Sequence, residues 1–167
     1  MVGMDLYRGT IGKRDRRTFV PGAIPEETLR RMLQAGRMTP SSKNAEPNRF
    51  VVVRDQATKD AIAGLSPLSR WLAKADVIVV LVQTQEHPFD AGRAAQNMML
   101  AAYNDGIGSC PAHVPEGPLA QLLRIPEGVF VNRVIGFGSI DPERAGPPPG
   151  VARKRLPLEE LVHYDRW

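Results

Sequence analysis

The clearest repeating pattern of apolar positions in the chain predicts a helix. Leu29, Met32 and Leu33 recur at helical spacing, and Pro25 before them suits a first helical position. The helix is expected to stop near Thr39, because the proline that follows disfavours helical backbone in the residue before it. We therefore expect one well-defined helix in the first quarter of the chain.

Uninterrupted apolar runs predict strands. Residues 50–53 and 77–82 carry these runs. A strand is also expected at residues 130–137, and residues 107–114 are expected to form a further strand or turn. The run at 77–82 has no polar alternation, so this strand is expected to be covered on both faces.

A long helix with many small side chains is predicted between these strands. Asp90 is expected to cap its start, the helix should run to about Asn104, and Gly106 should lie just past its end. Weaker patterns predict short helical segments at residues 7–13, 119–123 and 158–162. Helices and strands do not alternate strictly, so we expect an α+β fold in a single domain spanning residues 1–167.

Composition narrows the class of protein. Hydrophobic residues make up 43% of the chain and charged residues 24%, a globular balance. The longest apolar run is far shorter than the roughly 20 residues that span a bilayer. The first residues lack the basic-then-apolar pattern of a secretory signal, so we expect a cytoplasmic protein without a membrane segment. Cys110 is the only cysteine, which excludes an intrachain disulfide.

The net charge of +4 does not by itself indicate a nucleic-acid partner. Aromatic residues are only 6% of the chain and do not interleave with the basic runs, so no stacking surface for bases is expected. The sequence also lacks the common motifs of hydrolases, phosphate-binding loops and zinc proteases. His87, His113 and His163 are scattered, so neither a catalytic triad nor a metal site is expected.

Two separated basic clusters are the main candidates for chemistry. They are Lys13-Arg14-Asp15-Arg16-Arg17, called the first basic segment below, and Arg153-Lys154-Arg155 near the other end of the chain. Several basic side chains satisfy a phosphate group well through charge-assisted hydrogen bonds. One bound phosphate would explain both clusters, although composition alone is equally compatible with two solvated surface patches.

A small polar segment, residues 40–44, follows the predicted helix. It reads Pro40-Ser41-Ser42-Lys43-Asn44 and is rich in hydroxyl and amide groups. Such groups suit a polar heterocycle or a polyol chain, whereas in an ordinary loop they would bond their own backbone.

Four segments in order make the chain resemble the FMN-dependent nitroreductase family in its compact form. The first basic segment with Thr18-Phe19 is similar to the family's R-R-S-x-R-x-F. Residues 35–50 resemble its A-x-x-A-P-S-x-x-N-x-Q-P-W-x-F stretch. Residues 96–109 look like its central helix and glycine exit, and residues 153–160 look like its closing R-x-R/K-x-P-L-E-E.

The resemblance implies a central, mainly antiparallel sheet flanked by helices, in an intertwined homodimer with FMN at the subunit interface. It nominates basic residues for the flavin phosphate and ribityl chain, namely Lys13, Arg14, Arg17, Arg153 and Arg155. It places Pro40, Ser41, Ser42 and Asn44 against the flavin of the other subunit, Pro111, Ala112, His113 and Val114 along the reactive face, and Arg70 near the polar side of the ring.

The activity implied by the resemblance is electron transfer from NADH or NADPH through FMN to a nitroaromatic, quinone or similar acceptor, with ping-pong kinetics. No catalytic side chain is required, because the cofactor carries the chemistry. Two alternatives stay open, a flavin-binding or sensing protein without turnover and a flavin-fragmenting enzyme similar to dimethylbenzimidazole synthases.

Three residues depart from the family pattern. Asp15 stands where serine is usual, and we expect it to pair with Arg14 or Arg17 or to accept hydrogen bonds from ribityl hydroxyls. Glu46 and Asn48 replace the usual glutamine and tryptophan, which predicts a more acidic and more open environment beside the ring.

Overall fold

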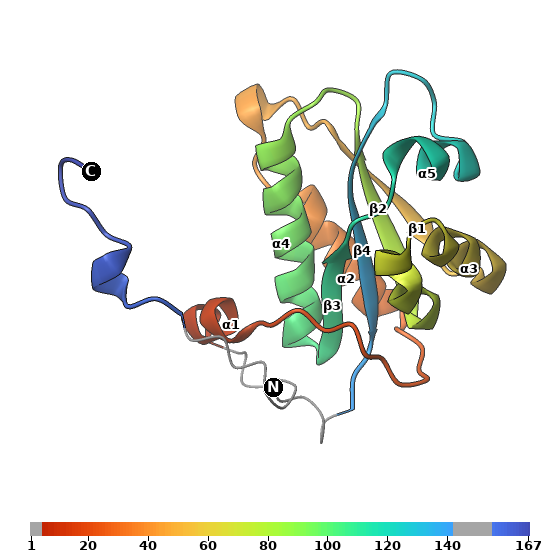
Figure 1. Ribbon diagram of the computed structural model, residues 1–167, viewed down its shortest axis with the longest axis horizontal. Coiled ribbons are helices and arrows are strands. Elements are labelled where there is room, and N and C mark those ends of the chain that lie inside the picture. The colour runs from red at the N-terminus through yellow and green to blue at the C-terminus, as the bar shows by residue number, and fades with distance from the viewer. Residues whose placement is uncertain (1–4, 142–154) are drawn as a thin grey trace.

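The computed structural model of the protein describes residues 5–141 and 155–167. Its centre is a four-stranded sheet in the order β1-β2-β4-β3, and every neighbouring pair of strands is antiparallel (Figure 1). The strands are β1 (Asn48–Val53), β2 (Val77–Gln83), β3 (Ile107–Ala112) and β4 (Phe130–Ser139). The predicted antiparallel sheet and α+β class are therefore confirmed.

Helices cover both faces of this sheet. On one face lie α2 (Glu26–Arg37) and α4 (Pro88–Asn104). On the other lie α3 (Gln56–Gly64), the 3₁₀ segment η2 (Pro67–Lys74) and α5 (Glu116–Leu122). Figure 1 shows α4 and α3 on opposite sides of the strands. Every residue of β2 is buried, as expected for a strand covered twice.

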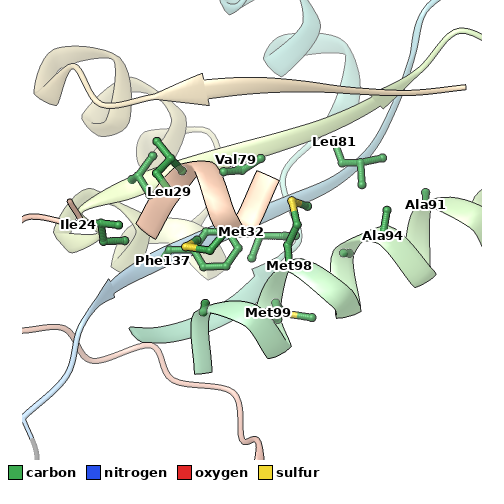
Figure 2. Packing of buried hydrophobic residues seen from close by; sticks show 14 residues of the cluster. Ile24, Leu29, Met32, Val79, Leu81, Ala91, Ala94, Met98, Met99 and Phe137 are labelled. Carbon is green, nitrogen blue, oxygen red and sulfur yellow. The ribbon is translucent and has the colours of Figure 1, made fainter. Parts of the chain in front are cut away.

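The core between the sheet and the α2–α4 layer is built from long, flexible and small side chains. Met32, Val79, Met98 and Phe137 meet there, and Figure 2 shows Met98 reaching from α4 toward the sheet. Gly36 lets α2 come close, because a Cβ atom at this position would lie 2.8 Å from Cγ of Met98. This tight layer fixes α4, the element that both predicted parts of the site contact.

Three short elements complete the described chain. They are α1 (Leu6–Gly12), η1 (Ser42–Asn44) and η4 (Leu158–Glu160). In Figure 1 the C-terminal segment that contains η4 lies apart from the sheet, beyond α1. Among the described residues, the longest helices are too short or too polar for a bilayer, and none could cross one.

The predicted cap of α4 was wrong. The helix begins at Pro88, so Asp90 lies inside its first turn, and its carboxylate is buried. The start is fixed earlier because Gln83 accepts a hydrogen bond from the backbone N–H of His87 at 3.0 Å and donates one to its carbonyl oxygen at 3.0 Å. Gly106 does follow the helix, with a positive φ of 75°.

Candidate functional site

The first basic segment runs alongside β3. Asp15 forms an isolated parallel bridge with Ser109, and the backbone N–H of Arg16 donates to the carbonyl oxygen of Ser109 at 2.9 Å. Backbone pairing therefore places these charged side chains between the edge of the sheet and the C-terminal half of α4.

Asp15 pairs with Lys13, not with Arg14 or Arg17 as the sequence suggested. The ammonium group of Lys13 contacts the Asp15 carboxylate and also Sδ of Met99 at 3.4 Å. The Lys13 side chain is only 7% exposed, so this carboxylate balances a largely buried charge. Arg14 instead donates from Nη1 to the carbonyl oxygens of Ile11 and Lys13, at 2.6 and 2.9 Å.

Arg17 reaches the single cysteine. Its Nε donates to Sγ of Cys110 at 3.3 Å. Burial raises the pKa of the Cys110 thiol above its usual range, while the hydrogen bond from Arg17 acts in the opposite direction. The thiol is therefore held neutral at physiological pH and contributes packing and a weak acceptor.

A cavity of about 110 Å³ opens beside this segment. Its polar lining includes Lys13, Arg14, Arg16, Tyr103 and Ser109. The hydroxyl of Ser109 is buried and has no hydrogen-bond partner among the described residues. Because buried hydroxyls are nearly always bonded, a missing acceptor is indicated, and the cationic lining fits a phosphate oxygen.

Ser109, Arg16 and Tyr103 were not among the predicted site residues. Arg16 belongs to the predicted basic cluster, and Ser109 ends the glycine exit of the central helix, so their signals were present in the sequence. Tyr103 carried no such signal, because its approach to the segment depends on how α1 packs against α4. A Cβ atom at Gly12 would lie 3.2 Å from the Tyr103 hydroxyl, which shows how closely these elements approach.

The small polar segment and the two residues that follow it, residues 40–46, are called the serine-asparagine segment below. This segment is strained and firmly anchored. Lys43, Asn44 and Glu46 adopt positive φ values of 52°, 52° and 47°. Such values in residues other than glycine cost free energy and are concentrated at functional sites. Two hydrogen bonds hold the segment, since the N–H of Ser42 donates to the buried Asp90 carboxylate at 2.9 Å and the N–H of Glu46 donates to the Ser41 hydroxyl at 2.9 Å.

Within one chain this segment and the first basic segment contact different ends of α4. The serine-asparagine segment meets α4 at Asp90, whereas the first basic segment meets it at Met99. Nine residues of helix separate these contacts, which is about 14 Å along the axis. The two segments therefore do not meet at one point of α4 within a single chain.

The remaining predicted residues occupy several places. Pro111 and Ala112 end β3, His113 is exposed and Val114 is buried. Arg70 is exposed on η2, an element of the α3 and α5 side of the sheet. Arg155 is exposed in the C-terminal segment, and Arg153 lies outside the described residues.

The two substituted positions of the family pattern lie close together in the fold. Glu46 and Asn48 border a cavity of about 480 Å³ between α2 and the start of β1. Asn48 accepts a hydrogen bond from Nε2 of Gln83 at 2.8 Å, which holds its short side chain against the sheet. Within the described ranges, no cluster of three His, Cys, Asp or Glu residues is arranged to hold a metal ion.

Comparisons of the chain with known proteins agree on one family. The profile of the Nitroreductase family matches residues 11–76 and 67–139. A protein of Archaeoglobus fulgidus with the provisional name NADH dehydrogenase/NAD(P)H nitroreductase is 28% identical over 139 residues, covering 75% of this chain and 80% of the relative. The FMN reductase (NAD(P)H) of Bacillus subtilis is 23% identical over 193 residues, covering 98% of this chain and 74% of the relative.

A solved structure agrees at the level of the fold. The crystal structure of a Bacteroides thetaiotaomicron protein with the same provisional name superimposes with a TM-score of 0.83 at 26% identity. The superposition covers 96% of this chain and 97% of the other. From the ordered motifs, the antiparallel sheet and these matches, the chain belongs to the nitroreductase family.

Proposed function

We propose that the protein is an FMN-dependent oxidoreductase that transfers electrons from NADH or NADPH to a nitroaromatic, quinone or similar acceptor. The observation that carries the proposal is the first basic segment, which is held on β3 beside the unbonded hydroxyl of Ser109 in a nitroreductase fold. The names of two relatives, one a nitroreductase and one an FMN reductase, support the same chemistry.

The flavin phosphate is assigned to the cavity beside β3. Lys13, Arg14 and Ser109 would donate to its oxygens, and Arg155 would close the site from the C-terminal segment. Arg14 is available for this role, because its side chain forms hydrogen bonds only to the backbone carbonyl oxygens of Ile11 and Lys13. Arg17 would be a positioning residue, since its Nε is directed at Cys110.

The active form would be a homodimer. The C-terminal segment exposes apolar side chains that one chain leaves uncovered, among them Leu158, Tyr164 and Trp167. Tyr164 is 86% exposed, far more than a large aromatic side chain usually is on the surface of a complete assembly. A second copy would cover these residues and would bring its Ser41, Ser42 and Asn44 to the flavin.

Bound FMN would supply the redox chemistry, accepting two electrons from the nicotinamide and passing them on to the acceptor. The chain would bind the phosphate, orient the ring and exclude water, while the end of β3 and His113 would border the reactive face. Donor and acceptor would occupy the same face in turn, which gives ping-pong kinetics. Acid or base side chains would not be needed at the reacting atoms.

Anaerobic mixing tests this proposal. FMN-loaded protein is mixed with NADH and, separately, with NADPH, and the flavin absorbance is followed before a nitroaromatic or quinone is added. Bleaching by at least one donor and recovery with the acceptor are expected. A flavin that stays oxidised with both donors would indicate a binding or sensing protein, and loss of the flavin itself would indicate a fragmenting enzyme.

A further inference from the structure

The cavity between α2 and the start of β1 is strongly cationic. Three guanidinium groups line it, from Arg30, Arg37 and Arg49, and we call it the three-arginine cavity. Its volume of about 480 Å³ is large enough for a phosphorylated ribose or a nucleotide fragment. Glu46 is the one carboxylate of the lining. The other lining residues are uncharged, namely Leu33, Gln34, Thr39, Ser41, Asn48 and Phe50.

Among the residues that the structure describes, these arginines have no carboxylate partner. The ion pairs among the described residues join other side chains, and Glu46 takes part in none of them. Arg37 donates from Nε to Oε1 of Gln34 at 2.9 Å, and Arg49 donates from Nη1 to two backbone carbonyl oxygens at 2.8 Å. Arg30 has no hydrogen-bond partner among the described residues. Three guanidinium forks gathered without a counter-charge favour an anionic ligand, and phosphate matches their geometry.

The cavity is continuous with the serine-asparagine segment. Ser41 and Glu46 belong to both, and Glu46 is held by the hydrogen bond from its N–H to the Ser41 hydroxyl. This segment is the part of the chain that would approach the flavin of the other subunit. If that segment borders the flavin, the cationic cavity adjoins the place where a dinucleotide would bind.

We infer that the three-arginine cavity binds the 2′-phosphate of NADPH and makes NADPH the preferred electron donor. The inference rests on the proposed function and adds the identity of the donor. NADH lacks this phosphate, so it would gain nothing from the guanidinium groups, while the remaining contacts would be shared by both nucleotides. Asn48, where the family pattern has tryptophan, lines this cavity with a short side chain.

Replacing two of the arginines by glutamine tests whether the cavity binds the phosphate. In the variant Arg30→Gln/Arg37→Gln both cationic groups on α2 are removed, whereas Arg49 is kept because it holds the backbone near Glu46. The matched control is Arg31→Gln, which removes a positive charge from the same helix outside the cavity, where it pairs with Asp105 at 3.3 Å. Binding of adenosine 2′,5′-bisphosphate and of adenosine 5′-monophosphate to FMN-loaded protein is measured by calorimetry, and flavin reduction by NADPH and NADH is measured anaerobically.

The double variant should bind the bisphosphate and NADPH roughly 10- to 100-fold more weakly, as expected for losing one or two charge-assisted hydrogen bonds. The monophosphate and NADH should change little, and Arg31→Gln should behave like the wild type. Equal losses for both nucleotides, or no loss for either, would overturn the inference. A change in oligomeric state with unchanged nucleotide binding would also overturn it, and would assign the cavity to an acidic segment of a second copy, such as Glu159 and Glu160.

The calorimetric arm separates this inference from the proposed function. If the wild type binds the bisphosphate through the arginines but its flavin is reduced by neither donor, the cavity assignment stands and the electron-transfer activity fails. If both donors reduce the flavin equally well in the wild type and in the variant, the activity stands and the cavity assignment fails.

Discussion

Two cationic regions of the molecule differ in how their charges are balanced. In the first basic segment, Lys13 is paired with Asp15, Arg14 bonds backbone carbonyl oxygens and Arg17 bonds a thiol. In the three-arginine cavity, the guanidinium groups have no carboxylate partner among the described residues. The first region is contiguous in the chain, whereas the second gathers residues from α2 and β1.

The first basic segment is preorganised for a ligand, whereas the three-arginine cavity is open. The first segment is fixed by backbone pairing to β3, so its side chains are placed before any ligand arrives. Such preorganisation suits a cofactor that stays bound. The guanidinium groups of the cavity have no ion-pair partner among the described residues, which suits a ligand that binds and leaves in each catalytic cycle.

The largest effect is expected from Arg14→Ala/Arg155→Ala. Losing two charge-assisted contacts to the flavin phosphate should weaken FMN binding by about 100-fold or more. Fluorescence titration of FMN measures the change. The control Arg54→Ala/Lys74→Ala removes two positive charges from a different cavity, beside the start of α3, and should leave FMN affinity near that of the wild type. Unchanged affinity in the first variant would place the phosphate elsewhere.

Removing the carboxylate of the first segment should have a smaller, opposite effect. In Asp15→Asn the Lys13 ammonium loses its partner and becomes available to a phosphate, so FMN should bind about fivefold more tightly at low salt. Riboflavin binding should not improve, because it has no phosphate. Weaker binding of both flavins would instead show that Asp15 accepts hydrogen bonds from the ribityl hydroxyls.

The corresponding change in the three-arginine cavity is Glu46→Gln. It removes the only carboxylate of the lining and keeps the shape of the side chain. NADPH should bind about threefold more tightly, with little change for NADH, and the gain should fade as salt is raised because the groups are exposed. Asp60→Asn, which removes a carboxylate from α3, is the control. An equal gain for both nucleotides would contradict a phosphate-specific cavity.

The smallest effect concerns pH. Burial raises the pKa of the Cys110 thiol, so the neutral thiol is favoured in the folded state. This contribution to stability is fully present below the pKa of the unfolded thiol and is lost as pH rises toward the higher folded value. Arg17→Gln should raise the pKa further by removing the hydrogen bond and the charge. The pH dependence of the ultraviolet absorbance of the thiolate measures this in the folded protein, and a downward shift would contradict the account.

Strong local patterns predicted much of the fold. The helix expected at 25–39 is α2, and the run at 77–82 is β2 to within one residue. α3 was missed because its apolar positions are few, although Asp55 gave a signal as its cap, accepting from the N–H of Thr58 at 2.8 Å. Its position also depends on a distant contact, since Gln56 donates to the carbonyl oxygen of Ala73 at 3.0 Å.

The candidate site also has parts that local sequence patterns could predict and parts that they could not. The first basic segment was visible because its charges are adjacent in sequence, but its internal pairing was not, because Lys13 is turned toward Asp15 by the packing of α1 on α4. Arg30 and Arg37 are two helical turns apart and could have been placed on one face. Arg49 joins them only through the topology of the sheet, so the three-arginine cavity could not be predicted from the sequence.

Comparing FMN with riboflavin tests the central claim most directly. The two ligands differ only in the phosphate that the first basic segment is assigned to hold. Titration of the flavin-free protein should show FMN binding at least about 100-fold more tightly than riboflavin, from two or more charge-assisted hydrogen bonds. Equal affinities, or no binding of either flavin, would contradict the account.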